Sequence, residues 1–246
     1  MICAISQPTF LPYLGYFELI DRADVFVLLD SVQFQRRSWQ TRNRIVNPQG
    51  VPQMVNVPVQ SKGLYHAPIV DIEIAVDPKW PRKTLGSISH SYGRAPHFDE
   101  QFDPLRDVLI AGHRRLADLN ISLIRHFCTV LGIDTPFVRS SEIATSGSKD
   151  ALLVSLCTEV GANCYYSGAM GMEYIRDKLF EKTDISISIQ EYTPAPYRQV
   201  NTDEFIPFMS VVDALMCCGE EVLSIIRAGA EPAGQNRERS SVDSVA

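Results

Sequence analysis

The chain has 246 residues, of which 45% are hydrophobic, and this is enough to bury one sizeable core. Its formal net charge is −6, which argues against a general binder of nucleic acid or of anionic membranes, because such surfaces attract cationic proteins. We therefore expect one α/β domain over residues 1–228 that inserts into no membrane and binds no nucleic acid.

A βαβ unit is predicted at the start of the chain. The apolar run Met1–Ser6 is typical of a buried strand, and Gln7 with the following proline ends it. Residues 16–22 have the spacing of a short amphipathic helix, and residues 25–29 form a second apolar run that ends at Asp30. Two such strands with a helix between them should be parallel, as in a Rossmann-type sheet flanked by helices.

The rest of the chain continues the α/β pattern. Strand-like or turn-rich sequence extends to about Val76, and Pro58 indicates an edge position within it. From residue 229 the sequence is small, polar and charged, so we expect a disordered tail over 229–246. Helices are predicted over 80–92, 102–132, 148–161, 174–180 and 205–227 (a closing pair), and short strands over 137–138, 163–166 and 185–189.

The first motif is the proline-rich turn from Gln7 to Tyr16. It leads from the first strand into the first helix, so it should lie over the carboxyl end of the strand. The free amides of the helix N-terminus would favour an anion there. A tight connection packed by aromatic rings is the alternative, and the polar Gln7 at the strand end favours a pocket.

The second motif is the basic segment that begins at Asp30 and ends at Ile45. Residues 31–70 contain no Asp or Glu, but they hold five basic residues, four of them arginines at 36, 37, 42 and 44. The planar fork of arginine suits bidentate binding of phosphate or carboxylate. A solvated basic face and a local anion site both fit this composition, and for the anion site we select Arg42 with Arg37 or Arg36.

A third motif, Tyr165 to Gly171, follows a predicted strand and contains two glycines that allow a ligand to approach the backbone. The six cysteines lack paired metal-binding spacing and the five histidines are scattered, so we expect reduced thiols and no metal site. No signal peptide or apolar span long enough for a bilayer is visible, and we expect a cytoplasmic protein.

The runs QPTFLPYLGYFELI, DSVQFQRRSWQTRNRI, YYSGAMGMEYI and FMSVVDALMCCG together resemble the WbqC-like protein family. Members of that family are associated with bacterial gene clusters for O-antigen and other polysaccharides. The resemblance therefore implies a role in making or modifying unusual sugars, with the two N-terminal runs as its specific part.

A more distant resemblance concerns the fold. The strand, proline-containing loop and glycine-started helix are similar to those of nucleotidyltransferases whose HxGH motif holds the phosphates of ATP. Tyr13 and Tyr16 stand where that motif has its two histidines. Tyrosine brings no positive charge at neutral pH, so this departure puts ordinary nucleotidyl transfer in doubt.

The leading hypothesis is a transferase that moves an acyl or aminoacyl group from a phosphate-bearing donor to an amino sugar. The donor would be a nucleotide, a nucleotide sugar or a phosphopantetheine-linked group, and Asp30 would be the general base. The alternatives are an ATP-dependent adenylating enzyme or ligase, and a non-catalytic partner that binds a sugar nucleotide. We expect the site to lie in one cleft above the carboxyl ends of the first two strands. The expected catalytic residues are Asp30, Gln7 and Tyr16, and the expected ligand-binding residues are Gln33, Arg37, Ser38, Arg42, Asn43, Ser167 and Gly168.

Overall fold

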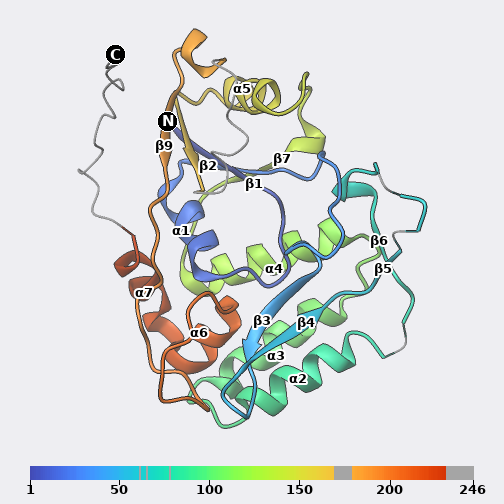
Figure 1. Ribbon diagram of the computed structural model, residues 1–246, viewed down its shortest axis with the longest axis vertical. Coiled ribbons are helices and arrows are strands. Elements are labelled where there is room, and N and C mark those ends of the chain that lie inside the picture. The colour runs from blue at the N-terminus through green and yellow to red at the C-terminus, as the bar shows by residue number, and fades with distance from the viewer. Residues whose placement is uncertain (61, 65, 78, 169–178, 231–246) are drawn as a thin grey trace, which may run out of the picture.

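A five-stranded, all-parallel sheet forms the centre of the molecule (Figure 1). The computed structural model describes residues 1–60, 62–64, 66–77, 79–168 and 179–230. The strand order is β7-β2-β1-β8-β9, which confirms the predicted Rossmann-like α/β fold and the parallel pairing of the first two strands. These strands are β1 (Ile2–Ser6), β2 (Val25–Leu28), β7 (Phe137–Arg139), β8 (Cys164–Ser167) and β9 (Ser186–Ile189).

Helices cover both faces of this sheet. In Figure 1, α1 (Leu14–Arg22) and α4 (Leu116–Leu131) lie on one side, and α5 (Asp150–Glu159) lies on the other. Successive residues of a strand point to opposite faces. Accordingly, Ala4 belongs to the larger core with the helices α1 and α4, whereas Ile5 belongs to a smaller core under α5.

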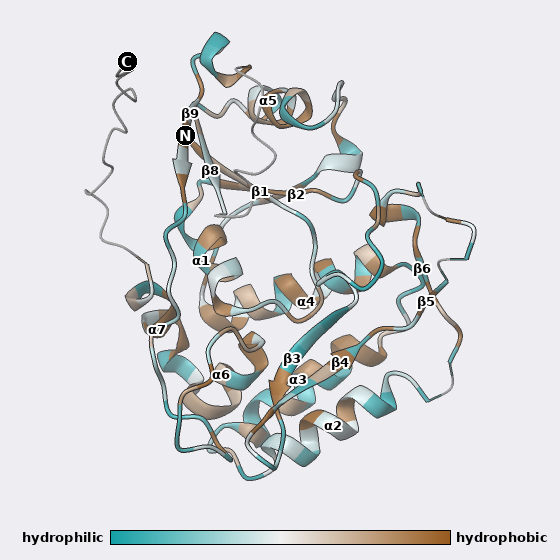
Figure 2. Ribbon diagram, in the orientation of Figure 1, coloured by the Kyte–Doolittle hydropathy of each residue, from teal (hydrophilic) through white to brown (hydrophobic). Residues whose placement is uncertain are grey.

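A second layer of chain extends the larger core. It contains the hairpin of β3 (Arg42–Val46) and β4 (Pro52–Asn56), the short pair β5 (Val59–Gln60) and β6 (Glu73–Ile74), and the helices α2 (Arg82–Tyr92) and α3 (Phe98–Ile110). Figure 2 shows β3 hydrophilic where it begins and hydrophobic where it ends. The strand-like segment up to Val76 thus forms two small sheets, and Pro58 separates them.

One predicted helix is two helices in the structure. The sequence pattern indicated a continuous helix over 102–132, but α3 ends at Ile110 and α4 begins at Leu116. Between them, Gly112 adopts a left-handed backbone with φ +79°, and Arg115 forms a β-bridge with Glu73. The apolar spacing continues across this turn because both helices face the same core, so periodicity alone did not reveal the break.

The C-terminal helices α6 (Val211–Cys218) and α7 (Val222–Ala228) confirm the predicted closing pair. Residues 174–178 of the predicted helix over 174–180 lie outside the described residues, and Phe180 begins a short 3-10 helix. Gly229 and Ala230 pair with the segment at Tyr192 and Thr193, and the rest of the expected tail also lies outside the described residues. None of the helices in the described ranges is long and apolar enough to cross a bilayer.

Candidate functional site

A polar residue ends or follows each of the five parallel strands. Parallel strands place their carboxyl ends at one edge of the sheet, which is where ligands bind in open α/β folds. β1 and β2 pair in register up to Ser6 and Leu28, so the segments that follow them leave the sheet side by side. The polar residues at this edge are Gln7 after β1, Asp30 after β2, Ser140 after β7, Ser167 at the end of β8 and Gln190 after β9.

Asp30 is fully buried, with an exposed fraction of 0%. Its carboxylate accepts hydrogen bonds from Arg139 Nε at 2.8 Å and from Ser140 Oγ at 3.1 Å. The backbone nitrogen and the hydroxyl of Ser141 donate two more, at 2.9 and 3.0 Å. These four donors occupy both oxygens. The geometry therefore favours an anchoring role for Asp30 over that of a general base, which needs a lone pair facing the substrate.

Arg139 forms an ion pair with Asp30. Its Nη1 also donates to Asp118 at 3.0 Å, so Arg139 bridges the carboxylate that follows β2 and one on α4. Burial opposes the charge of Arg139, but hydrogen bonds and attraction from Asp30 and Asp118 still raise its pKa. The ion pair spans 109 positions in sequence, and no local pattern pointed to it.

Gln7 lies half-buried at the end of β1 and is held by one partner from the basic segment. Nε2 of the buried Gln40 donates to its Oε1 at 2.7 Å, while Oε1 of Gln40 accepts from the backbone nitrogen of Gln35. Because its oxygen is engaged, the N–H donors of the Gln7 amide are the groups left to meet a ligand.

Carboxamide side chains also fix the proline-rich turn. Nδ2 of Asn43 donates to the carbonyl oxygen of Phe10 at 3.1 Å, and Nδ2 of Asn120 donates to those of Pro8 and Gln40 at 3.0 and 2.8 Å. Both asparagines are buried. Asn43, an expected ligand-binding residue, therefore links the proline-rich turn to β3 through its side chain.

Arg42 and Arg44 share one face of β3. Their neighbours Asn43 and Ile45 point to the core, whereas the two arginines are half-buried on the opposite face. The Nε atoms of both arginines are buried and have no hydrogen-bond partner. Neither arginine forms an ion pair with any carboxylate in the described part of the chain. This face therefore carries two cations whose charge the fold does not balance.

Aromatic rings and a carbonyl group surround Arg44. Its guanidinium carbon lies 5.6 Å from the ring centroid of Trp39, and its Nη2 donates to the carbonyl oxygen of Phe208 at 3.3 Å. The ring of Phe208 in turn lies 6.0 Å from that of Tyr13, at the start of α1. Phe208 thus links Arg44 to Tyr13 at the start of α1.

Gln33, Arg37 and Ser38 lie on the loop before β3. Gln33 is exposed and forms a β-bridge with Pro68, and Arg37 is exposed with a left-handed backbone at φ +58°. The hydroxyl of Ser38 donates to the carbonyl oxygen of Gln35 at 2.7 Å. Ser38 thus stabilises the loop that carries Arg37.

Tyr16 is part of the core. Its ring packs against Phe17 and Phe26, and its hydroxyl donates to the carbonyl oxygen of Gln7 at 3.1 Å. Burial raises the pKa of Tyr16 well above its ordinary value, so the phenol remains neutral. Tyr16 therefore holds the backbone of Gln7 through this hydrogen bond and presents no group to a ligand.

Glu18 is a buried carboxylate on α1. It is 1% exposed, accepts a hydrogen bond from Tyr166 Oη at 2.9 Å, and accepts another from Gln190 Nε2. Arg22 Nη1 lies 3.6 Å away. Burial raises the pKa of Glu18, although these donors and Arg22 oppose the rise. Its two hydrogen-bond donors come from β8 and from the end of β9, far along the chain, so local spacing gave no signal for its burial.

Ser167 and Gly168 lie at the same edge of the sheet. Ser167 is buried, and its hydroxyl donates to the carbonyl oxygen of Gly168 at 3.1 Å. A side chain at Gly168 would stand 3.5 Å from Leu19 and 3.7 Å from the amide oxygen of Gln190, so there is room for a small group but little more. Residues 169–178, which include Gly171 of this motif, lie outside the described residues.

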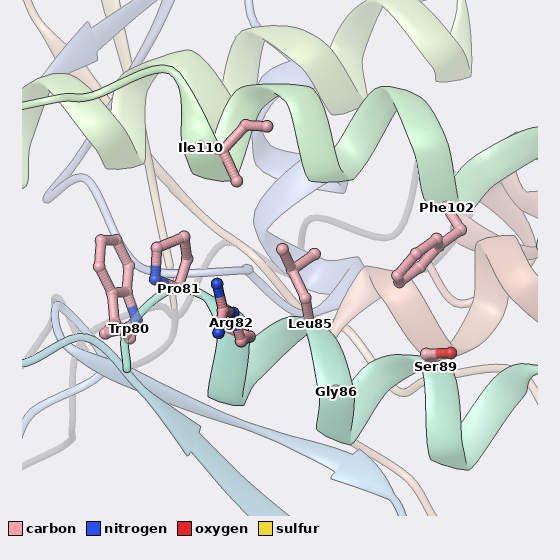
Figure 3. Close-up of a pocket in the computed structure, with 8 residues that line it drawn as sticks. All are labelled: Trp80, Pro81, Arg82, Leu85, Gly86, Ser89, Phe102 and Ile110. Atoms are coloured by element: carbon pink, nitrogen blue, oxygen red, sulfur yellow. The ribbon is translucent and has the colours of Figure 1, made fainter. Parts of the chain in front are cut away.

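Two hollows on the molecule lie away from the predicted site residues. One, of about 410 Å³, is a groove between α2 and α3, with Trp80 and Pro81 at one end and Phe102 at the other (Figure 3). The second, of about 670 Å³, is lined by residues that include Tyr197 and Cys217. Across the described ranges, no three His, Cys, Asp or Glu side chains gather in a way that could hold a metal ion.

Comparison with known proteins identifies the family. The model of the WbqC-like protein family matches residues 7–225. The chain belongs to the WbqC-like family. One relative is the uncharacterized protein Rv1507c of Mycobacterium tuberculosis, which is 32% identical to this chain over 227 residues. The alignment covers 91% of this chain and 96% of that protein. No solved structure matches the chain.

The family match covers the elements that build the candidate site except β1, which ends at Ser6 just before the match begins. It includes Gln7 at the end of β1, the arginine face of β3, and the strands β7 and β8. The chain and the mycobacterial protein correspond over almost their full lengths, so the two share this domain as a whole.

Proposed function

We propose that this WbqC-like protein is an enzyme that transfers an acyl or aminoacyl group from a phosphate-bearing donor to an amino sugar. The observation that carries the proposal is the pair Arg42 and Arg44, which stand on one face of β3 without a carboxylate partner among the residues that the structure describes. Family membership supports the sugar acceptor, because the family is associated with polysaccharide gene clusters.

Unpaired buried donors favour an anionic ligand on energetic grounds. A buried N–H group without an acceptor costs about 1–3 kcal/mol. Arg42 and Arg44 each leave one such group, and a phosphate bound to the outer N–H groups of these guanidiniums would offset their charge. The two Cα atoms are separated by two residues of a strand, or about 7 Å, so both guanidiniums can reach one diphosphate.

Gln7 is the residue at this edge best suited to act on the reacting carbonyl group. Gln40 holds its oxygen, and Tyr16 supports its backbone, so its amide N–H donors are fixed in direction. Fixed donors of this kind stabilise the negative charge that develops on a carbonyl oxygen during acyl transfer. The sugar amine would attack the carbonyl carbon, the bond from that carbon to the donor would break, and the proton from nitrogen would pass to the leaving group.

A survey of ligands by thermal unfolding tests the donor class. Coenzyme A, nucleotides and nucleotide sugars are added to the protein, and a ligand that binds only the folded state raises the melting temperature. We expect Arg42→Ala to weaken binding of the best ligand by about 1.5–3 kcal/mol, the range of a hydrogen bond to a charged group. Arg125→Ala removes an exposed arginine of α4 and is the matched control.

Product analysis tests the reaction itself. The protein is incubated with the binding donor and an amino sugar, and the sugar is examined by mass spectrometry for a gain of the acyl mass. Release of pyrophosphate from ATP in the same assay would instead indicate an adenylating enzyme. Tight binding without turnover of any donor would contradict the transferase and indicate a non-catalytic partner.

A further inference from the structure

The indole of Trp39 is exposed although its backbone is firmly held. Its exposed fraction is 45%, and its carbonyl oxygen accepts a hydrogen bond from the backbone nitrogen of Phe10 at 2.9 Å. The residue before it, Ser38, donates a hydrogen bond to the carbonyl oxygen of Gln35, and the residue after it, Gln40, is buried. A large aromatic side chain thus stands on a firmly held backbone and is open to solvent.

The charge around Trp39 is positive. The guanidinium of Arg44 lies 5.6 Å from the centroid of its ring, which is within the range of a cation–π contact. Arg42 lies two residues before Arg44 on the same face of β3. An exposed ring beside two uncompensated arginines combines the two parts that a nucleotide requires, a stacking surface for the base and cations for the phosphates.

Trp39 is not needed to neutralise or shield Arg44. The Nη2 atom of Arg44 already donates to Phe208, and its Nε atom remains without a partner in spite of the ring. Met54, which stands opposite Arg44 on β4, is also 43% exposed, so the apolar surface at this place extends beyond the indole. Exposed apolar area of this kind, rimmed by polar groups, is typical of a ligand site.

We propose that Trp39 stacks on the base of a nucleoside diphosphate whose phosphates are held by Arg42 and Arg44. The inference rests on the proposed function and narrows its donor to one that carries a base, such as a nucleotide sugar or coenzyme A. A phosphopantetheine group without adenine would leave the indole unused.

Fluorescence provides a direct test, because the chain has only two tryptophans. Trp80 lies in the groove between α2 and α3 (Figure 3), and Trp80→Phe leaves Trp39 as the sole indole reporter. This variant is titrated with ADP, UDP, coenzyme A, 4′-phosphopantetheine and inorganic pyrophosphate. We expect the nucleotides and coenzyme A to quench the emission, and the two probes without a base to leave it nearly unchanged.

Binding measured by calorimetry separates the base from the phosphates. Stacking of a base on an aromatic side chain corresponds to about a 10-fold or larger change in affinity. In the otherwise unchanged protein, Trp39→Ala should weaken the binding of the preferred nucleoside diphosphate by that factor and leave pyrophosphate binding unchanged. Trp39→Phe should retain part of the affinity for the nucleoside diphosphate. Arg42→Ala should weaken the binding of both the nucleoside diphosphate and pyrophosphate.

The outcomes distinguish this inference from the function on which it rests. If pyrophosphate and the nucleotides bind equally well and Trp39→Ala changes neither, the stacking role is wrong and the phosphate site remains. If no phosphate-bearing probe binds at all, both proposals fail. An unchanged melting temperature of Trp39→Ala shows that a loss of affinity is not a loss of folding.

Discussion

Replacing Asp30 by asparagine separates an anchoring role from a catalytic one. Asparagine retains one oxygen, which can still accept from Ser140 and from the backbone of Ser141. It loses the acceptor for Arg139 Nε and for the hydroxyl of Ser141. A hydrogen bond to a charged group contributes about 1.5–3 kcal/mol and a neutral one about 0.5–1.5 kcal/mol, so we expect a loss of about 2–4 kcal/mol in the free energy of unfolding.

The assay is thermal unfolding followed by circular dichroism. For a chain of this length 1 kcal/mol corresponds to about 2–4 °C, so the melting temperature should fall by about 4–16 °C. Asp118→Asn is the matched control, because Asp118 pairs with the same arginine but its side chain is 41% exposed, and such pairs contribute about 1 kcal/mol or less. An Asp30→Asn protein with an unchanged melting temperature and no turnover would refute the anchoring role and restore Asp30 as the base.

Three further predictions concern stability. Burial raises the pKa of Glu18 above its ordinary 4.5, so the folded state retains a proton that the unfolded state loses, and the stability from this group should fall as the pH rises above the pKa of the unfolded state. Glu18→Gln should remove this fall in urea titrations at a series of pH values, and a variant that keeps the same fall would contradict the prediction. Asp213→Ala should lower the free energy of unfolding by about 3 kcal/mol or more, because Tyr92, Tyr197 and Gln199 all donate to this buried carboxylate. Asp203→Ala, at an exposed position, is the control and should change it by about 0.5 kcal/mol or less. Removal of residues 234–246 should leave solubility and the melting temperature unchanged, and loss of cooperative unfolding would show that the tail contributes to the fold.

The sheet could be predicted from the sequence because its strands are local signals. The runs that became β1 and β2 are continuously apolar, as expected for strands buried on both faces, and the helix between them has its own periodicity. The hairpin of β3 and β4 was harder to predict, since Arg42 and Arg44 make β3 read as a polar loop. Its strand character comes from pairing with β4, where Asn43 lies opposite Val55.

The common edge at which Gln7 and Asp30 lie was predicted from the sequence, and the hydrogen-bond partners at that edge were not. Gln7 and Asp30 close neighbouring strands, so their shared edge follows from the parallel order. Asp30 and Glu18 each accept a hydrogen bond from a residue more than 100 positions away in sequence, Arg139 and Tyr166 respectively. Contacts at such separations depend on how the whole sheet is ordered, and a single sequence contains no periodicity that reports them.

Charges in the described part of the molecule fall into two groups. Three buried acids are satisfied by the fold itself: Asp30 has four donors, Glu18 has a tyrosine and a glutamine, and Asp213 has three donors of its own. Arg42 and Arg44 keep buried N–H groups without acceptors, within a chain whose net charge is negative. The fold had carboxylates to pair with them, since the net charge of −6 reflects an excess of Asp and Glu. An arrangement that satisfies these three acids and leaves two adjacent cations open is the complement of an anionic ligand, and the edge of the sheet beside Gln7 is where that ligand would meet the rest of the site.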